Sequence, residues 1–143
     1  MRSILSCEVP GKMKIAIVAR EDWSVGLLAN AAACIASGLF YREDNLVGEQ
    51  INGKDCIFIP ITKIPILILR QNNKPFNELL KRAKRNKLKY VVFTKEAQST
   101  TSYEEYANRV KDRQLNELVP IGIGVLGEDA AIARFCGDLP LLR

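Results

Sequence analysis

The chain has 143 residues, of which 48% are hydrophobic and 26% charged, a composition typical of one globular domain rather than a disordered chain. Its net charge of +5 favours anionic partners such as nucleic acid or phosphate, and it contains no histidine. The absence of histidine excludes histidine-based acid–base catalysis, Ser-His-Asp triads and zinc sites with His ligands.

Cysteine spacing and the length of apolar runs indicate the cellular compartment of the protein. None of the cysteines (Cys7, Cys34, Cys56 and Cys136) pairs with another at CxxC spacing, so we predict buried free thiols, as in a reducing cytoplasm, with no metal or other cofactor. No apolar run reaches the roughly 20 residues that span a bilayer. The sequence therefore predicts a cytoplasmic protein without a membrane partner.

The first part of the chain predicts an extension and then a domain. Residues 1–12 hold too short an apolar stretch for a signal peptide and predict a short flexible extension. Met13 is an alternative start, and the sequence does not decide between it and Met1. Residues 13–143 predict a single α/β domain.

A buried strand and an apolar helix open this domain. The run of Ile and Val in Met13–Ala19 predicts a buried central strand. Ser24 can cap a helix over residues 25–39, and Gly38 can end it. Small apolar residues on nearly all sides predict that this helix is covered on most faces.

Residues 41–70 contain a loop and one strand. The polar stretch 41–55 predicts a loop with at most a short strand. We expect a loop or edge segment at 56–62 and a strand at 64–70, because Pro60 and Pro65 disfavour a central strand.

The rest of the chain alternates between helices and strands. We predict a helix with Pro75 in its first turn, a buried strand, an amphipathic helix, a strand containing Gly122 and Gly124, and a last short helix. Their ranges are 73–87, 88–94, 101–113, 119–127 and 128–138. This alternation predicts an α/β fold, and the two glycines predict a close approach of backbone or ligand.

Asn30 is the one strongly polar side chain within the apolar helix. A buried amide must find hydrogen-bond partners. It either bonds the backbone of a neighbouring loop or lies in a pocket wall beside the carboxylates that follow the first strand. The two interpretations are compatible, because pockets of open α/β sheets form at the carboxyl ends of strands.

Glu21, Asp22 and Trp23 follow the first strand. Adjacent carboxylates in extended backbone point to opposite sides, so Glu21 and Asp22 are not a ready-made acid–base pair. Trp23 is more typical of a core plug or a hydrophobic staple, and the rim of a ligand site is the alternative.

Hydroxyl side chains and one amide cluster after the predicted strand 88–94. Capping by Thr101 or Ser102 accounts for part of this cluster, because Glu104 and Glu105 favour a helix N-terminus. The cluster also lies where a site would form. We therefore expect ligand contacts from part of it: Thr94, Gln98, Thr100 and Thr101.

A basic stretch covers the helix at 73–87. A solvated outer face is the usual explanation of such charge, and a phosphate-backbone contact surface is the alternative. In the second interpretation the nucleic-acid contacts are Lys81, Arg82, Lys84 and Arg85.

Three stretches together resemble a known family. "KIAIVAREDW" with "GLLANAAA", "VVFTKEAQSTTSYEEY" and "GIGVLGEDAAIARFCGDLPLLR" are similar to the domain of unknown function 2000 family over residues 13–143, with "YEEY" and the "LPLLR" ending the most specific parts. The resemblance implies a fold like that of type-2 peptidyl-tRNA hydrolase: a three-layer α-β-α sandwich around a small mixed, mostly parallel sheet. It implies no established activity.

The chain also resembles those hydrolases directly in "AIVAREDW" and "VLGEDAAIARFCGDLPLL". It departs from their pattern at three functional positions. Gly26 is followed by Leu27 where the hydrolases have a catalytic Lys, Lys95 and Glu96 stand where one Asp is expected, and Gly122 falls near their strand threonine. The resemblance therefore implies the fold and a pocket in the same place, with Asn30 near the hydrolases' helix glutamine, rather than peptidyl-tRNA hydrolysis.

Three hypotheses of function remain open. The first is a small hydrolase or transferase in which Asp22 or Glu21 is the base and Asn30, Gln98 and Thr100 position the substrate, since a carboxylate must move the proton without histidine. The second is a non-catalytic module that binds a small molecule, or an oligomeric scaffold, with a homodimer the expected assembly. The third is binding of tRNA or another nucleic acid through the basic helix.

Overall fold

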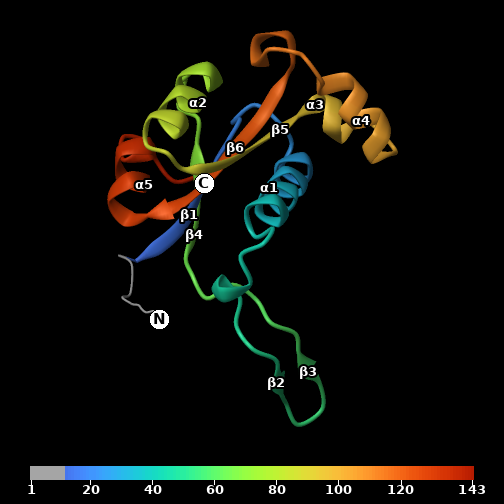
Figure 1. Ribbon diagram of the computed structural model, residues 1–143, viewed down its shortest axis with the longest axis vertical. Coiled ribbons are helices and arrows are strands. Elements are labelled where there is room, and N and C mark those ends of the chain that lie inside the picture. The colour runs from blue at the N-terminus through green and yellow to red at the C-terminus, as the bar shows by residue number, and fades with distance from the viewer. Residues whose placement is uncertain (1–11) are drawn as a thin grey trace.

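The computed structural model describes residues 12–143 (Figure 1). The predicted flexible extension falls almost wholly in residues 1–11, outside the described residues, and so does Cys7. The main elements are β1 (Met13–Ala19), α1 (Val25–Leu39), β4 (Ile66–Arg70), α2 (Phe76–Arg85), β5 (Lys89–Thr94), α3 (Lys95–Gln98), α4 (Tyr103–Val110), β6 (Pro120–Glu128) and α5 (Asp129–Cys136). Two 3-10 turns (Asp44–Leu46 and Leu115–Glu117) and two short strands, β2 (Ile51–Asn52) and β3 (Ile57–Phe58), complete the described chain.

The central sheet is mixed, with the strand order β4-β1-β6-β5. β1 pairs in parallel with β4, whereas β6 pairs antiparallel with both β1 and β5. β1, β4 and β5 thus point the same way, but only one of the three strand pairings is parallel. The prediction of a mostly parallel sheet is therefore wrong. The reason is that β6 inserts between β1 and β5 in the opposite direction, a position that periodicity does not reveal.

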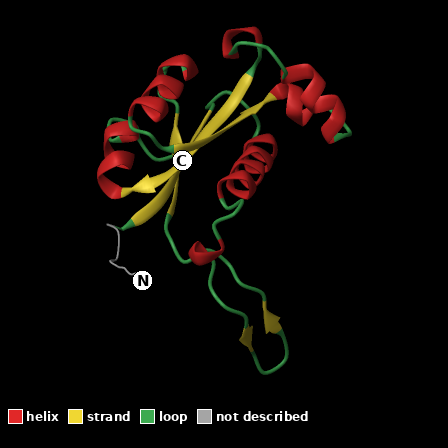
Figure 2. Cartoon of the chain, in the orientation of Figure 1, coloured by secondary structure: helices red, strands yellow, loops and turns green. Residues whose placement is uncertain are grey.

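Helices cover both faces of this sheet, as expected for three layers (Figure 2). One buried cluster joins α2 and α5 to the sheet through side chains such as Leu79 and Phe135. The other joins α1 to the opposite face through Ile35 and Leu39. Alternate residues of β1 supply both clusters, because successive side chains of a strand point to opposite faces.

Gly124 allows α1 to lie close to the sheet. A Cβ on Gly124 would lie 2.2 Å from Cγ2 of Ile35, and one on Gly122 would lie 3.1 Å from Cδ1 of the same residue. The predicted close approach is therefore confirmed. A side chain of α1 approaches both glycines, and at Gly122 the backbone carbonyl oxygen of Val18 lies as near, at 3.0 Å from such a Cβ.

The two edges of the sheet differ. The C-terminal residues run beside β4: Arg70 N donates to the Pro140 carbonyl at 2.8 Å and Leu142 N donates to the Ile68 carbonyl at 3.0 Å. Within residues 12–143, no segment pairs in this way with the outer side of β5. The sheet therefore has one covered edge and one open edge.

Helix α1 is not covered on most faces, which corrects the expectation from its composition. Leu28, Ala31, Ile35 and Leu39 are buried, and the opposite side of the helix is exposed to solvent. Alanine and glycine permit close packing but do not require burial, so an alanine-rich outer face looks like a core face in the sequence. Cys34 lies on the exposed side and Cys56 is also exposed, both contrary to expectation, whereas Cys136 is buried as predicted.

Element boundaries follow the predictions closely, with two additions. The short helix α3 begins directly after β5, because Thr94 ends the strand and caps the helix, and this turn was expected to be loop. Residues 47–62 form a hairpin that includes β2 and β3, where the sequence predicts a loop and an edge segment. This hairpin extends away from the sheet at the bottom of Figure 1.

Candidate functional site

Three strands end at the same edge of the sheet and place their following residues together. β1, β4 and β5 point the same way, so residues 20–24, 71–74 and 94–99 meet there. Gln71 N donates to the Ala19 carbonyl at 3.0 Å, and Lys95 N donates to the Val119 carbonyl at 2.8 Å. These backbone bonds fix the loops that carry the predicted site residues.

Asp22 is held by Arg20. The guanidinium donates two hydrogen bonds to the carboxylate, from Nε at 3.0 Å and from Nη2 at 2.9 Å. This hydrogen-bonded pairing lowers the pKa of Asp22 below its usual value. The Arg20 guanidinium also lies 5.3 Å from the centre of the Trp23 ring, a cation–π distance.

Glu21 faces away from Asp22, as expected for adjacent residues. One carboxylate oxygen accepts a hydrogen bond from the backbone N–H of Asn72. The other lies 3.9 Å from Nη1 of Arg70. Asn72 has a φ of 53°, a left-handed conformation that asparagine tolerates, so Glu21 stabilises the tight turn after β4.

Asn30 is exposed rather than buried, which corrects the premise of a buried amide. Its Oδ1 accepts a hydrogen bond from Gln98 Nε2 at 3.4 Å. Gln98 Nε2 also donates to the Leu27 carbonyl at 3.3 Å. Asn30 therefore contacts α3 through a side chain, and it does not line the groove that lies between α3 and the start of α1.

A groove of about 560 Å³ lies between the start of α1 and α3. We call it the ligand groove. Trp23 packs against the core and also forms part of the groove wall, so packing on the core is confirmed and its role at the rim of a ligand site stays a prediction. The lining residues are Asp22, Trp23, Ser24, Leu27, Lys95, Gln98 and Ser99.

Positive charge and free donors meet in the ligand groove. Lys95 is exposed, and no carboxylate within residues 12–143 lies within ion-pair distance of its ammonium. Ser24 precedes α1, but its hydroxyl makes no capping hydrogen bond, and the first turn of α1 holds no acidic residue. The first backbone N–H groups of a helix have no intrahelical acceptor, so this end of α1 favours negative charge.

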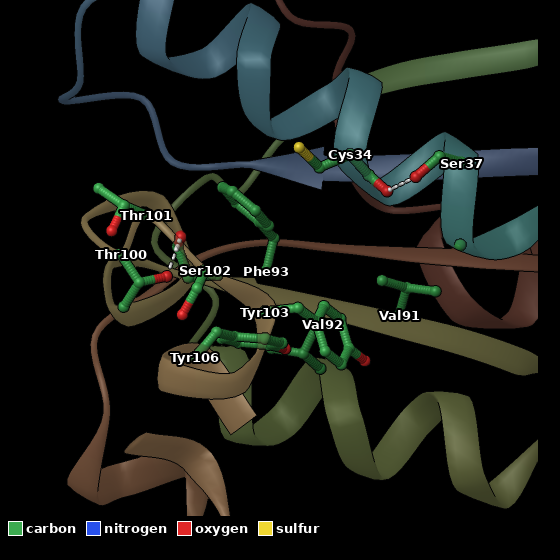
Figure 3. Close-up of a pocket in the computed structure, with 12 residues that line it drawn as sticks. Cys34, Ser37, Val91, Val92, Phe93, Thr100, Thr101, Ser102, Tyr103 and Tyr106 are labelled. Atoms are coloured by element: carbon green, nitrogen blue, oxygen red, sulfur yellow. Dashed lines mark hydrogen bonds between the residues drawn. The ribbon is translucent and has the colours of Figure 1, made fainter. Parts of the chain in front are cut away.

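A second groove, of about 500 Å³, lies over β5 between α1 and α4 (Figure 3). We call it the strand-edge groove. Cys34 and Ser37 line it from α1, and Tyr103 and Tyr106 line it from α4, with their rings 5.5 Å apart in an edge-to-face arrangement. Within residues 12–143, no charged side chain lines this groove. Burial raises the pKa of Tyr106, with a further rise from Tyr103.

Thr100 and Thr101 line the strand-edge groove instead of the ligand groove. The predicted ligand-binding threonines are thus separated from Asp22, Trp23 and Gln98. Thr94 is only 3% exposed, and its hydroxyl accepts a hydrogen bond from Ala97 N at 3.3 Å. Thr94 is a helix cap with no surface to offer a ligand, which corrects its expected role.

The basic residues of α2 lie in two different environments. Lys81, Lys84 and Arg85 are exposed. Arg82 is different: its side chain is 13% exposed and bonds both carboxylate oxygens of Asp138, at 2.8 and 3.1 Å. The expected nucleic-acid contact at Arg82 is therefore wrong, because this guanidinium is used to join α2 to the residues after α5.

Several groove residues are not among the predicted ligand contacts. Lys95 and Ser99 lie in the hydroxyl-rich segment after β5, and Ser24 carries only a capping prediction. Tyr103 and Tyr106 of the strand-edge groove belong to the predicted amphipathic helix, whose periodicity does not reveal a groove. In the described part of the chain, no cluster of three acidic or cysteine side chains could hold a metal ion, and no helix has the length and apolarity to cross a membrane.

Comparison with known proteins gives a family and a fold. The model of the family described as "Protein of unknown function (DUF2000)" matches residues 13–143. Among solved structures, the chain is similar to a protein of unknown function, Atu0240, from Agrobacterium tumefaciens strain C58, with 16% sequence identity, a TM-score of 0.81 and coverage of 91% of this chain and 97% of that one. No curated protein matches the chain.

At that identity the structural likeness shows the fold alone, and the likeness to type-2 peptidyl-tRNA hydrolase stays a prediction. The family match covers nearly the whole chain and includes both grooves. The chain therefore belongs to the DUF2000 family of proteins of unknown function.

Proposed function

We propose that the protein binds a small anionic molecule with a flat apolar part in the ligand groove, without catalysis. The observation that carries this proposal is the meeting of Lys95, the Trp23 ring and the uncapped start of α1 in one groove. An ammonium and free helix N–H groups suit a carboxylate or phosphate, and an aromatic wall suits a ring.

The two carboxylates support binding over catalysis. A general base works best with a pKa near the working pH. Asp22 has a lowered pKa and both of its oxygens accept bonds from Arg20, whereas Glu21 is bound to the turn after β4. Asp22 is therefore poorly suited to take a proton and Glu21 is engaged with a turn, so the hydrolase or transferase hypothesis has less support from this geometry.

Trp23 provides a direct test, because it is the only tryptophan in the chain. We would titrate the protein with adenosine monophosphate, benzoate, N-acetylated aromatic amino acids and free adenosine while recording tryptophan fluorescence. The proposal expects a saturable change with one or more anions and a weaker change with neutral adenosine.

A lysine variant and a matched control complete the design. Lys95→Gln is expected to weaken anion binding several-fold, whereas Lys84→Gln removes an exposed lysine of α2 and leaves binding unchanged. No saturable fluorescence change up to millimolar anion, or binding that is indifferent to Lys95→Gln, would overturn the proposal.

The exposed face of α2 favours a second candidate, binding of tRNA or another nucleic acid. Lys81, Lys84 and Arg85 are exposed, and none has an ion-pair partner within residues 12–143. Phosphate contacts of this kind predict an affinity that falls steeply as salt rises. Mobility shifts with tRNA should be lost in the triple variant Lys81→Glu, Lys84→Glu, Arg85→Glu, and retention of binding would exclude this surface.

A further inference from the structure

The hairpin of residues 47–62 is an arm that stands clear of the sheet (Figure 1). Val47 bridges Thr62 at its base, Gly48 N donates to the Ile61 carbonyl at 2.8 Å, and Gly53 N donates to the Cys56 carbonyl at 2.8 Å near its tip. Its base is anchored, because Leu46 is buried and Lys63 N donates to the Leu46 carbonyl at 2.8 Å.

The arm exposes large apolar side chains on both of its faces. Ile51 of β2 lies opposite Phe58 of β3. Ile57, which precedes Phe58 in β3, points to the other face of the arm. A two-stranded ribbon is at best marginally stable in water unless another element covers it. The exposed fractions are 65% for Ile51, 59% for Ile57, 55% for Phe58, 70% for Ile59 and 77% for Ile61. The arm therefore has the character of an interface.

The charges of the arm narrow the choice of partner. Glu49 and Asp55 are balanced by Lys54 and by Lys63, which directly follows the arm. An anionic membrane or a nucleic acid selects basic surfaces, and the arm has none. Its partner is expected to be neutral and apolar.

The strand-edge groove is a neutral and apolar surface on the same chain. Among the described residues it is lined by the half-buried Val91 and Val92 and by the edge of the buried Phe93, all of β5, with hydroxyl groups around them and no charged side chain (Figure 3). β5 is also the open edge of the sheet, a position that extended segments join by strand addition. An extended apolar ribbon suits this groove, because the groove lacks charged side chains and borders an open strand edge.

The arm cannot reach the groove of its own chain. It leaves the body below the end of α1 and points away from α3 and α4, which flank the groove (Figure 1). We propose that the arm of each chain docks in the strand-edge groove of a second copy, so that two chains exchange arms about a two-fold axis. Such an isologous contact uses each surface once on each partner.

The two-fold exchange doubles the area that a single arm-to-groove contact buries. It thereby adds to the roughly 800 Å² that each partner of a stable interface buries. An uncovered apolar patch of this extent is uncommon on a monomer without a partner. The contact does not involve the ligand groove, so this inference stands apart from the proposed function.

The first test measures assembly by sedimentation equilibrium. We expect the full chain to sediment as a dimer at micromolar concentration and the double variant Ile57→Asp, Ile59→Asp to sediment as a monomer with unchanged circular dichroism. Val25→Asp is the matched control, because Val25 is 84% exposed and lies outside both surfaces, and it should leave the dimer intact. A monomer at all concentrations, or a dimer that survives the arm variant, would overturn the proposal.

The second test uses thiols that the chain already carries. Cys56 is exposed on the arm and Cys34 is exposed at the groove. With Cys7→Ser, a short bismaleimide should link Cys34 of one chain to Cys56 of an isotopically distinct second chain. Cys136 reacts slowly, because burial raises the pKa of its thiol to about 11. Links between two Cys56 residues alone would show arms pairing with each other and would refute docking in the groove.

Discussion

Gln98 on α3 donates a hydrogen bond to Asn30 on α1 at 3.4 Å and a second one to the Leu27 carbonyl at 3.3 Å. These contacts join two helices that follow different strands. Leu27 and Gln98 line the ligand groove, and Asn30 lies beside it. The amide pair is exposed to water, so its contribution to folding is small even though it brings together residues 68 positions apart.

Asn30→Ala should therefore leave the protein folded. We expect the free energy of unfolding to fall by less than about 1 kcal/mol, because the lost hydrogen bond is partly offset by the higher helix propensity of alanine. Urea denaturation measures this change. The matched control is Leu28→Ala, a truncation of a buried side chain in the same helix, with an expected loss of about 2–3 kcal/mol. An equal loss in both variants would contradict the exposed position of Asn30.

Gly124→Ala should destabilise the protein by about 1–3 kcal/mol, because the added methyl group would lie 2.2 Å from Cγ2 of Ile35 and 3.0 Å from Cδ1 of Leu39. Gly26→Ala is the control. A Cβ there meets no atom within 4 Å, and alanine is favoured over glycine in a helix by about 0.5–1 kcal/mol, so this variant should be more stable. Thermal melts of the two variants should move in opposite directions; a shift in the same direction would argue against close packing of α1 on β6.

The Arg82–Asp138 pair predicts a stability that depends on acid pH. The guanidinium holds the pKa of Asp138 at about 2, below its usual value, so the unfolded chain binds the proton more readily. The stabilisation is complete above about pH 4 and is lost as the pH falls through about 2. Since the side chain of Asp138 is 46% exposed, solvent screening limits the effect to about 1 kcal/mol.

Urea denaturation of Asp138→Asn between pH 2.5 and 7 checks this prediction. The difference in free energy of unfolding between wild type and variant should shrink as the pH is lowered. Asp112→Asn removes an exposed carboxylate that makes no ion pair within residues 12–143, and it should show no such trend. A difference that stays constant over the whole range would mean that the pair does not set the pKa of Asp138.

Asp22→Asn separates a binding role from a catalytic one. The substitution removes a negative charge from the ligand groove and releases Arg20 from its two bonds to that carboxylate. We expect anion affinity, measured by Trp23 fluorescence, to stay the same or to rise. Any turnover of a bound compound that is abolished by Asp22→Asn would instead support the hydrolase or transferase hypothesis.

Local residue patterns determined the elements of this fold. The strand Met13–Ala19, the helix Val25–Leu39 and the last helix ending near Gly137 follow from apolar periodicity, capping residues and glycine, and the structure confirms them. The glycines of β6 also predicted a close approach, because a missing Cβ is visible in the sequence. Placing a candidate site after the first strand and after β5 relied on the same local logic.

Only the tertiary structure decided which faces are covered and which side chains meet. Insertion of β6 between β1 and β5 made two pairings antiparallel, and the packing of one side of α1 left Asn30 and Cys34 exposed. Contact with Asp138 turned Arg82 away from the basic face. The elements, and the edge of the sheet where polar residues gather, follow from neighbours along the chain and were therefore predictable. The division into two grooves and the exposed arm depend on contacts between distant segments, which local patterns do not record.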